Sequence, residues 1–316
     1  MDALPTGGSS KGLIRGFMKH FKKIAIMTIL AGLACVRMTY AADPLPVFVS
    51  IPPQKYFVEK IGGNRVNVSI MVTPGSNPHN YEPKPNQMTA LSKAKIYFAI
   101  GITFEDAWLS RFSDINPKMR IVHTEEGIEK ISIAPHEHPQ GGDRRYPSKH
   151  KEERETKDPH VWLSPINVKM LANNVLKALQ YQDPSSSQIY NDNYKAFVRE
   201  IEDLDAELKS IFADKKGMKF MVFHPAWGYF AKAYDLVQVP IEFEGKEPKP
   251  AQLNELIKLA KKEKITVIFA QPQFSARSAE TIAKEIGGKV VMADDLAADW
   301  ADNLRNQARK FLSVLK

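Results

Sequence analysis

Three histidines and one aspartate in this chain of 316 residues have the side-chain types of a metal site. Neutral imidazoles with one carboxylate form the tetrahedral set that suits Zn²⁺, whereas Mg²⁺ and Ca²⁺ prefer sets made only of oxygen. The four side chains are widely separated along the chain, so only a fold could gather them. They are His79, His160, His224 and Asp294.

Each of these side chains is expected where a strand ends or a helix begins. His79, His224 and Asp294 follow the predicted strands 65–72, 218–223 and 289–293, respectively. His160 lies between Pro159 and the Ser164-Pro165 pair, which is typical of a helix N-cap and first turn. Ligands of parallel sheets bind beyond the carboxyl ends of the strands, which is where three of the four would lie.

The elements that must position them alternate between strand and helix. Such alternation indicates βαβ units and a mostly parallel sheet. The predicted strands are 46–51, 65–72, 94–100, 120–123, 218–223, 265–270 and 289–293. The predicted helices are 54–61, 86–93, 165–180, 184–212, 226–234, 251–263, 275–286 and 300–315.

The longest predicted helix separates two similar groups of elements. Its apolar side chains recur at helical spacing, at Ile189, Phe197, Ile201, Leu204, Leu208 and Ile211. We therefore predict an α/β fold with two similar lobes, each built on a mostly parallel sheet, joined by a single long helix. The expected boundaries are an amino-terminal lobe 43–183, a linker helix 184–213 and a carboxy-terminal lobe 214–316.

Residues 1–42 have the pattern of a secretory signal peptide. Six basic residues and one acidic residue there account for +5 of the net charge of +8. A short apolar run follows, and small residues permit cleavage after Ala41 or Ala42. Anchoring as a lipoprotein through Cys35 is the alternative. The remaining +3 is too weak a charge to indicate nucleic-acid binding.

Export would leave a mature chain without cysteine, because Cys35 is the only one. That excludes thiolate metal sites and cysteine nucleophiles, so any metal must be bound by histidine and carboxylate. A polar loop, 134–157, interrupts the amino-terminal lobe and has a possible auxiliary metal role. Its histidines are His136, His138 and His150.

Pattern alone leaves each histidine open to a second explanation. A histidine beside a proline in a loop can equally be structural, and the polar loop can be a solvated charged segment. No pair of histidines at i, i+4 spacing strengthens the metal interpretation. Asp158 and Glu105 could accept hydrogen bonds from ligand imidazoles, and Glu242 is a reserve ligand beside Asp294.

Four motifs, in order along the chain, resemble the metal-specific solute-binding proteins of bacterial ABC importers, and in particular their zinc-uptake branch. They are Gly-Ser-Asn-Pro-His-Asn-Tyr-Glu-Pro at 75–83, Asp-Pro-His-Val-Trp-Leu-Ser-Pro at 158–165, Phe-His-Pro-Ala-Trp-Gly-Tyr-Phe at 223–230 and Gly-Lys-Glu-Pro at 245–248. The resemblance implies a metal site between the lobes, with His79, His160 and His224 as ligands and Asp294 matching the acidic residue near the last strand. In some members of the zinc branch another carboxylate or water completes the site, so the fourth position stays open. The similar manganese branch has glutamate where this chain has His224.

The resemblance implies a periplasmic protein that captures Zn²⁺ with high affinity and delivers it to an ABC importer permease. We expect a monomer without enzymatic activity and without a nucleic-acid partner. Two alternatives stay open. One is a manganese or iron carrier of the same family, and the other is a secreted zinc-dependent hydrolase, because three histidines with an open position also describe catalytic zinc sites.

Overall fold

The structure, a computed structural model, describes residues 43–133, 157–242 and 246–315. From Pro44 onward the chain forms one compact unit, Pro44–Lys316. The expected signal peptide with Cys35 and the loop histidines His136, His138 and His150 lie outside the described residues.

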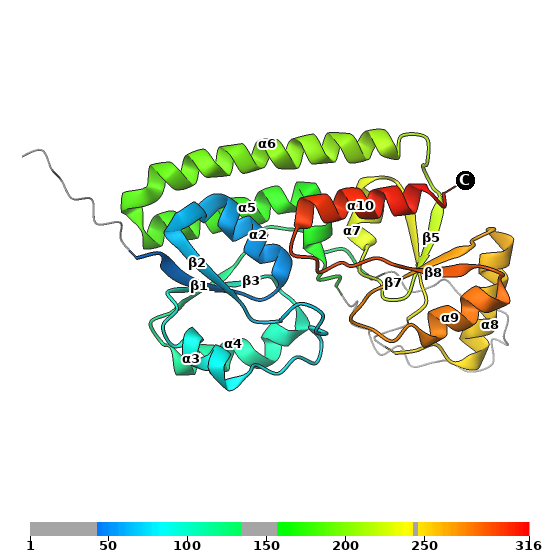
Figure 1. The fold of residues 1–316 in the computed structure, drawn as a ribbon, viewed down its shortest axis with the longest axis horizontal. Helices are drawn as coiled ribbons and strands as arrows, with labels where there is room; N and C mark the ends of the chain where they lie inside the picture. Colours follow the sequence, from blue (N-terminus) through cyan, green and yellow to red (C-terminus); the bar gives the residue numbers. More distant parts are fainter. Residues whose placement is uncertain (1–42, 134–156, 243–245, 316) are drawn as a thin grey trace, which may run out of the picture. The chain divides into compact units, whose positions relative to one another are not determined.

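A parallel sheet in the order β2-β1-β3-β4 forms the core of the amino-terminal lobe. Its strands are β1 (Leu45–Val49), β2 (Val66–Ile70), β3 (Ile96–Ala99) and β4 (Arg120–His123). All residues of β3 are buried, as expected for an inner strand with helices on both faces. The helices α2 (Pro52–Gly62) and α5 (Pro165–Gln182) lie on one face, and α3 (Pro85–Leu91) and α4 (Thr103–Ile115) on the other (Figure 1).

The carboxy-terminal lobe repeats this topology, with a parallel sheet in the order β6-β5-β7-β8. Its strands are β5 (Lys219–Val222), β6 (Val237–Pro240), β7 (Val267–Ala270) and β8 (Lys289–Met292). Its helices are α7 (Gly228–Ala233), α8 (Pro250–Lys262), α9 (Arg277–Glu285) and α10 (Trp300–Leu312). The predicted fold class, two similar α/β lobes with parallel sheets and one long connecting helix, is confirmed.

The long helix α6 (Ser187–Ile211) has 25 residues and follows a short 3-10 turn at Pro184–Ser186. It packs against α2 and α5 of the first lobe and α10 of the second. Its buried face includes Tyr190 and Phe197, whereas Ile189 of the predicted stripe is 46% exposed. Tyr190 takes that place because it, and not Ile189, is in phase with the rest of the stripe.

Two elements were not predicted from the sequence, α4 and β6. Strand β6 is a four-residue edge strand that ends in Pro240, too short to give a strand pattern. Helix α4 has few buried apolar side chains, with Phe104 and Phe112 the large ones. Within the three described ranges, no helix combines the length and the apolar character needed to cross a membrane.

Candidate metal site

The turn before helix α5 holds His160 in a fixed orientation. The carboxylate Oδ1 of Asp158 accepts a hydrogen bond from the backbone N–H of His160 at 2.9 Å and lies 2.7 Å from its ring Nδ1. Both side chains are buried. With Nδ1–H donated to the carboxylate, the Nε2 of His160 carries a lone pair that can bind a metal.

His224, directly after β5, is held in the same way by the other lobe. Its Nδ1 lies 2.6 Å from Oε2 of Glu242, and both side chains are buried. Gln271 fixes the backbone on both sides, because its Oε1 accepts from the His224 N–H at 3.2 Å and its Nε2 donates to the His224 carbonyl at 2.8 Å. The Nε2 of His224 is therefore also left as an acceptor.

These two acceptors face each other. The Nε2 atoms of His160 and His224 are 3.3 Å apart, although one comes from each lobe. Two imidazole lone pairs at this distance repel unless a proton or a metal ion lies between them. The geometry is thus that of two ligands oriented for one cation.

His79 completes the cluster from the loop after β2. Its Nδ1 is 3.0 Å from the Thr103 hydroxyl at the start of α4, and its backbone N–H donates to Asn77 at 2.8 Å. Its ring centroid is 5.2 Å from that of His224. One ligand nitrogen from each of the three histidines lies within 4.8 Å of the others, and His79 is the only exposed member.

The carboxylate at this site belongs to Asp295 and not to Asp294. Asp295 lines the pocket and is 4% exposed, and its Oδ1 is buried with no hydrogen-bond partner among the described residues. Asp294 instead accepts from the Leu296 N–H at 2.9 Å and from Gln273 Nε2 at 3.0 Å. In the turn after β8 the side chain of Asp294 therefore accepts the hydrogen bond that closes the turn, and Asp295 faces the histidines.

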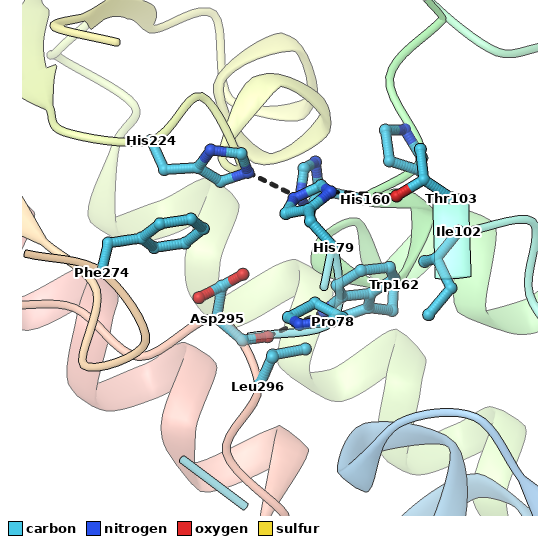
Figure 2. A pocket seen from close by; sticks show the side chains of 11 residues that line it. Pro78, His79, Ile102, Thr103, His160, Trp162, His224, Phe274, Asp295 and Leu296 are labelled. Atoms are coloured by element: carbon cyan, nitrogen blue, oxygen red, sulfur yellow. Dashed lines mark hydrogen bonds between the residues drawn. The ribbon is translucent and has the colours of Figure 1, made fainter. Parts of the chain in front are cut away.

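Apolar side chains surround the polar atoms of the pocket. Phe274 stacks on the ring of His224 with centroids 4.5 Å apart, and Trp162 lies against His160 at 5.2 Å. Figure 2 shows the Asp295 carboxylate on the same side of the histidines as Phe274. The other lining residues are Pro78, Ile102, Thr103, Pro159 and Leu296. Such walls limit the access of water, which favours a low coordination number.

The electrostatics of the cluster favour a bound cation. Desolvation in the cleft, and next the two neighbouring imidazoles, lower the pKa of His79 to about 4, even though the residue as a whole is exposed. Burial alone would lower the pKa of His160, but the carboxylates of Asp158, and next those of Asp295 and Glu242, together outweigh burial and the pKa is raised. Burial raises the pKa of Asp295. A metal ion would relieve both the imidazole repulsion and the desolvation of the carboxylate.

The structure brings together three of the four predicted ligands, His79, His160 and His224, and does not include Asp294. The predicted contact of Asp158 with the imidazole of His160 is present in the structure. The same role is wrong for Glu105, whose oxygens accept from the Ser50 hydroxyl and from the N–H groups of Ile100 and Gly101.

Glu242, considered as a reserve ligand, is the partner of His224 Nδ1. Thr103, Phe274 and Trp162 were not predicted as parts of the site. For Thr103 a signal existed, because it lies three residues after the end of the predicted strand 94–100. Phe274 likewise lies four residues after the end of the predicted strand 265–270, but an apolar ring there does not by itself indicate a metal site.

Comparisons with known proteins show the family of this chain. Residues 47–314 match the family described as zinc-uptake complex component A, periplasmic. The high-affinity zinc uptake system protein ZnuA of Bacillus subtilis is 28% identical over 258 residues, covering 80% of this chain and 79% of that protein. A crystal structure of ZnuA is 42% identical with a TM-score of 0.79, covering 87% of this chain and 100% of that one. A deletion mutant of ZnuA with zinc bound is also 42% identical, with a TM-score of 0.78 over 87% of this chain and 99% of that one.

Proposed function

The chain belongs to the family of periplasmic zinc-uptake components, and from this premise we propose that it captures Zn²⁺ outside the cytoplasm and delivers it to an ABC importer permease. The observation that carries the proposal is the convergence of three imidazole nitrogens within 4.8 Å of one another. The family is one of transport components, and we propose no catalytic role for this chain.

The donor set supports zinc as the cargo. Neutral imidazoles suit Zn²⁺, and the Asp158 and Glu242 carboxylates hold two of them in the tautomer that presents Nε2. We propose Asp295 as the fourth ligand in place of Asp294, because its buried Oδ1 has no other partner in the described part of the chain. Asp295 lines the same pocket as the three histidines.

The remaining expectations form part of the same proposal. Residues 1–42 would direct export and be removed after Ala41 or Ala42, and the mature chain would act as a monomer. The lobe boundaries 43–183, 184–213 and 214–316 are those we propose, with the linker helix as a rigid connection. Metal release would then need a local change at a ligand instead of a wide closure of the lobes.

Competition with a chromophoric chelator tests zinc capture, using the chain from residue 43 onward. We expect one tightly bound Zn²⁺ per chain, and a large loss of affinity in His160→Ala and His224→Ala. His123→Ala is the matched control, because His123 is an exposed histidine whose partner is Glu125 and not the cluster. Zinc binding that is unaffected in both cluster variants would refute the proposal.

The choice of metal and the delivery step need separate tests. Titration with Mn²⁺ against Zn²⁺ should show a strong preference for Zn²⁺, and tighter binding of Mn²⁺ would favour the manganese carrier instead. In cells starved of zinc, loss of this protein should lower the uptake of radioactive Zn²⁺. The wild-type gene should restore uptake, and the His224→Ala variant should not.

A further inference from the structure

A tryptophan of the amino-terminal lobe holds the acidic segment of the other lobe from both ends. The indole Nε1–H of Trp162 donates to the backbone carbonyl of Asp295 at 2.8 Å. The backbone carbonyl of Trp162 accepts from the indole Nε1–H of Trp300 at 2.7 Å. The segment 295–300 is thus attached at its first and last residue to a single residue across the interface.

The surroundings of these two hydrogen bonds are dry and rigid. Trp162 and Trp300 are each 1% exposed, so water does not compete for either bond. Trp300 also packs edge-on against Phe57 of α2, with centroids 5.3 Å apart, and against Phe197 of α6. The start of α10 is therefore fixed to the amino-terminal lobe as well as to its own.

Asp295 and Asp294 differ in what fixes them. Asp294 is held within its own lobe by Gln273 and by Asn303, whose Nδ2 donates to its carbonyl at 2.7 Å. The carbonyl of Asp295 is held from the other lobe, by the residue that lies two positions after His160. Figure 2 shows this bond on the floor of the pocket, below the histidines.

We propose that Trp162 is a positioning residue that sets the Asp295 carboxylate against the ligand His160, so that the fourth metal ligand is placed by the opposite lobe. This inference rests on the proposed role of Asp295 in zinc capture. The indole hydrogen bond of Trp162 orients the peptide of Asp295. The backbone of Trp162 places His160, because both residues belong to the same turn.

Trp162→Phe tests the inference because it removes the indole N–H and keeps an aromatic ring. We expect zinc affinity to fall by about 10–100-fold, the usual loss when an outer partner of a metal ligand is removed. The visible spectrum of bound Co²⁺ should change with the loss of the carboxylate ligand. Trp227→Phe is the matched control, because Trp227 is fully buried but its Nε1 has no partner among the described residues. That variant should keep the wild-type affinity and spectrum.

A double-mutant cycle distinguishes a Trp162 that positions Asp295 from a Trp162 that only lines and packs the pocket. If Trp162 acts through Asp295, Trp162→Phe should weaken binding in the wild-type protein and have no further effect in Asp295→Asn. An equal loss in both backgrounds, or a loss no greater than that of Trp227→Phe, overturns the inference. If Asp295→Asn binds zinc as tightly as wild type, Asp295 is not the fourth ligand, and the proposal on which this inference rests is refuted. If it binds more weakly while Trp162→Phe does not, only the positioning role fails.

The wild-type protein gives an independent measurement if Trp162→Phe does not fold. Coupling is reciprocal, so zinc binding should strengthen the bond that positions its ligand. The indole N–H of Trp162 should therefore exchange with solvent more slowly after zinc is added, and that of Trp227 should not change. Equal behaviour of the two indoles would overturn the inference.

Discussion

Replacing Asp158 by Asn removes one charge from the interior of the site and changes little else. Asp158 Oδ1 accepts from both the backbone N–H and the ring Nδ1–H of His160, at 2.9 and 2.7 Å. The amide oxygen of Asn can still accept both bonds, so His160 keeps its tautomer. What is lost is the charge that makes the imidazole a stronger donor to the metal. We expect zinc affinity to fall about 10–100-fold, which corresponds to about 1.4–2.7 kcal/mol.

The pH dependence makes this prediction specific. In the wild type, Asp158 raises the pKa of His160 above 6.5, so protons compete with zinc for Nε2 as the pH falls through that range. Removing the carboxylate removes the strongest influence that raises the pKa of His160, so the pKa falls and this competition moves to lower pH. The wild type should therefore lose affinity more steeply than Asp158→Asn between pH 8 and pH 6. The difference in zinc affinity between the two proteins should be largest at pH 8 and become smaller towards pH 6.

Chelator competition across this pH range, on both proteins, measures the effect. Asp302→Asn is the control, because Asp302 is an exposed aspartate whose partner is Arg305, and it should match the wild type. A difference in zinc affinity that is the same at every pH would indicate general structural damage and refute the electrostatic argument. So would a change of affinity below about twofold at pH 8, well under the loss expected for this class of residue.

Three further variants test other parts of the structure. Gly228→Ala would place a Cβ 2.6 Å from Oδ2 of Asp158, so zinc affinity should fall about 10-fold in the chelator assay, and an unchanged value would contradict the contact. Glu105→Gln would set an amide N–H against the N–H of Ile100 or Gly101, so urea unfolding should show a loss of about 1–3 kcal/mol. Phe197→Ala should lower the free energy of unfolding by about 3–5 kcal/mol, because it empties a buried position of α6. Since Phe197 does not line the pocket, a parallel loss of zinc affinity in the folded protein would contradict a role for Phe197 in the core alone.

Much of the fold could be predicted because its signals are local. Buried parallel strands such as β3 and β7 are short apolar runs, and prolines mark the first positions of α2, α3, α5 and α8. The elements that were missed have weak local signals. Strand β6 is a short edge strand, and α4 is stabilised by contacts that its own sequence does not display.

The residues of the site also differ in how far the sequence could indicate them. Residue type and position after a strand or before a helix made His79, His160 and His224 candidates, because strand ends in a parallel sheet converge on one edge. The family motifs that contain them then favoured these three over the other histidines. The choice between Asp294 and Asp295 could not be made in this way. Adjacent residues in a turn point in different directions, and only the hydrogen bonds of the turn decide which one faces the pocket.

The sequence by itself therefore determined the two-lobed α/β frame and indicated the kinds of side chain that this frame brings together. The tertiary structure decided that Glu242 holds His224 and Thr103 holds His79, and which carboxylate lines the site. It also placed Trp162 across the interface, in contact with Asp295. Trp162 and Asp295 are separated by 133 residues in the chain, and no local pattern encodes a contact made only when two lobes pack together.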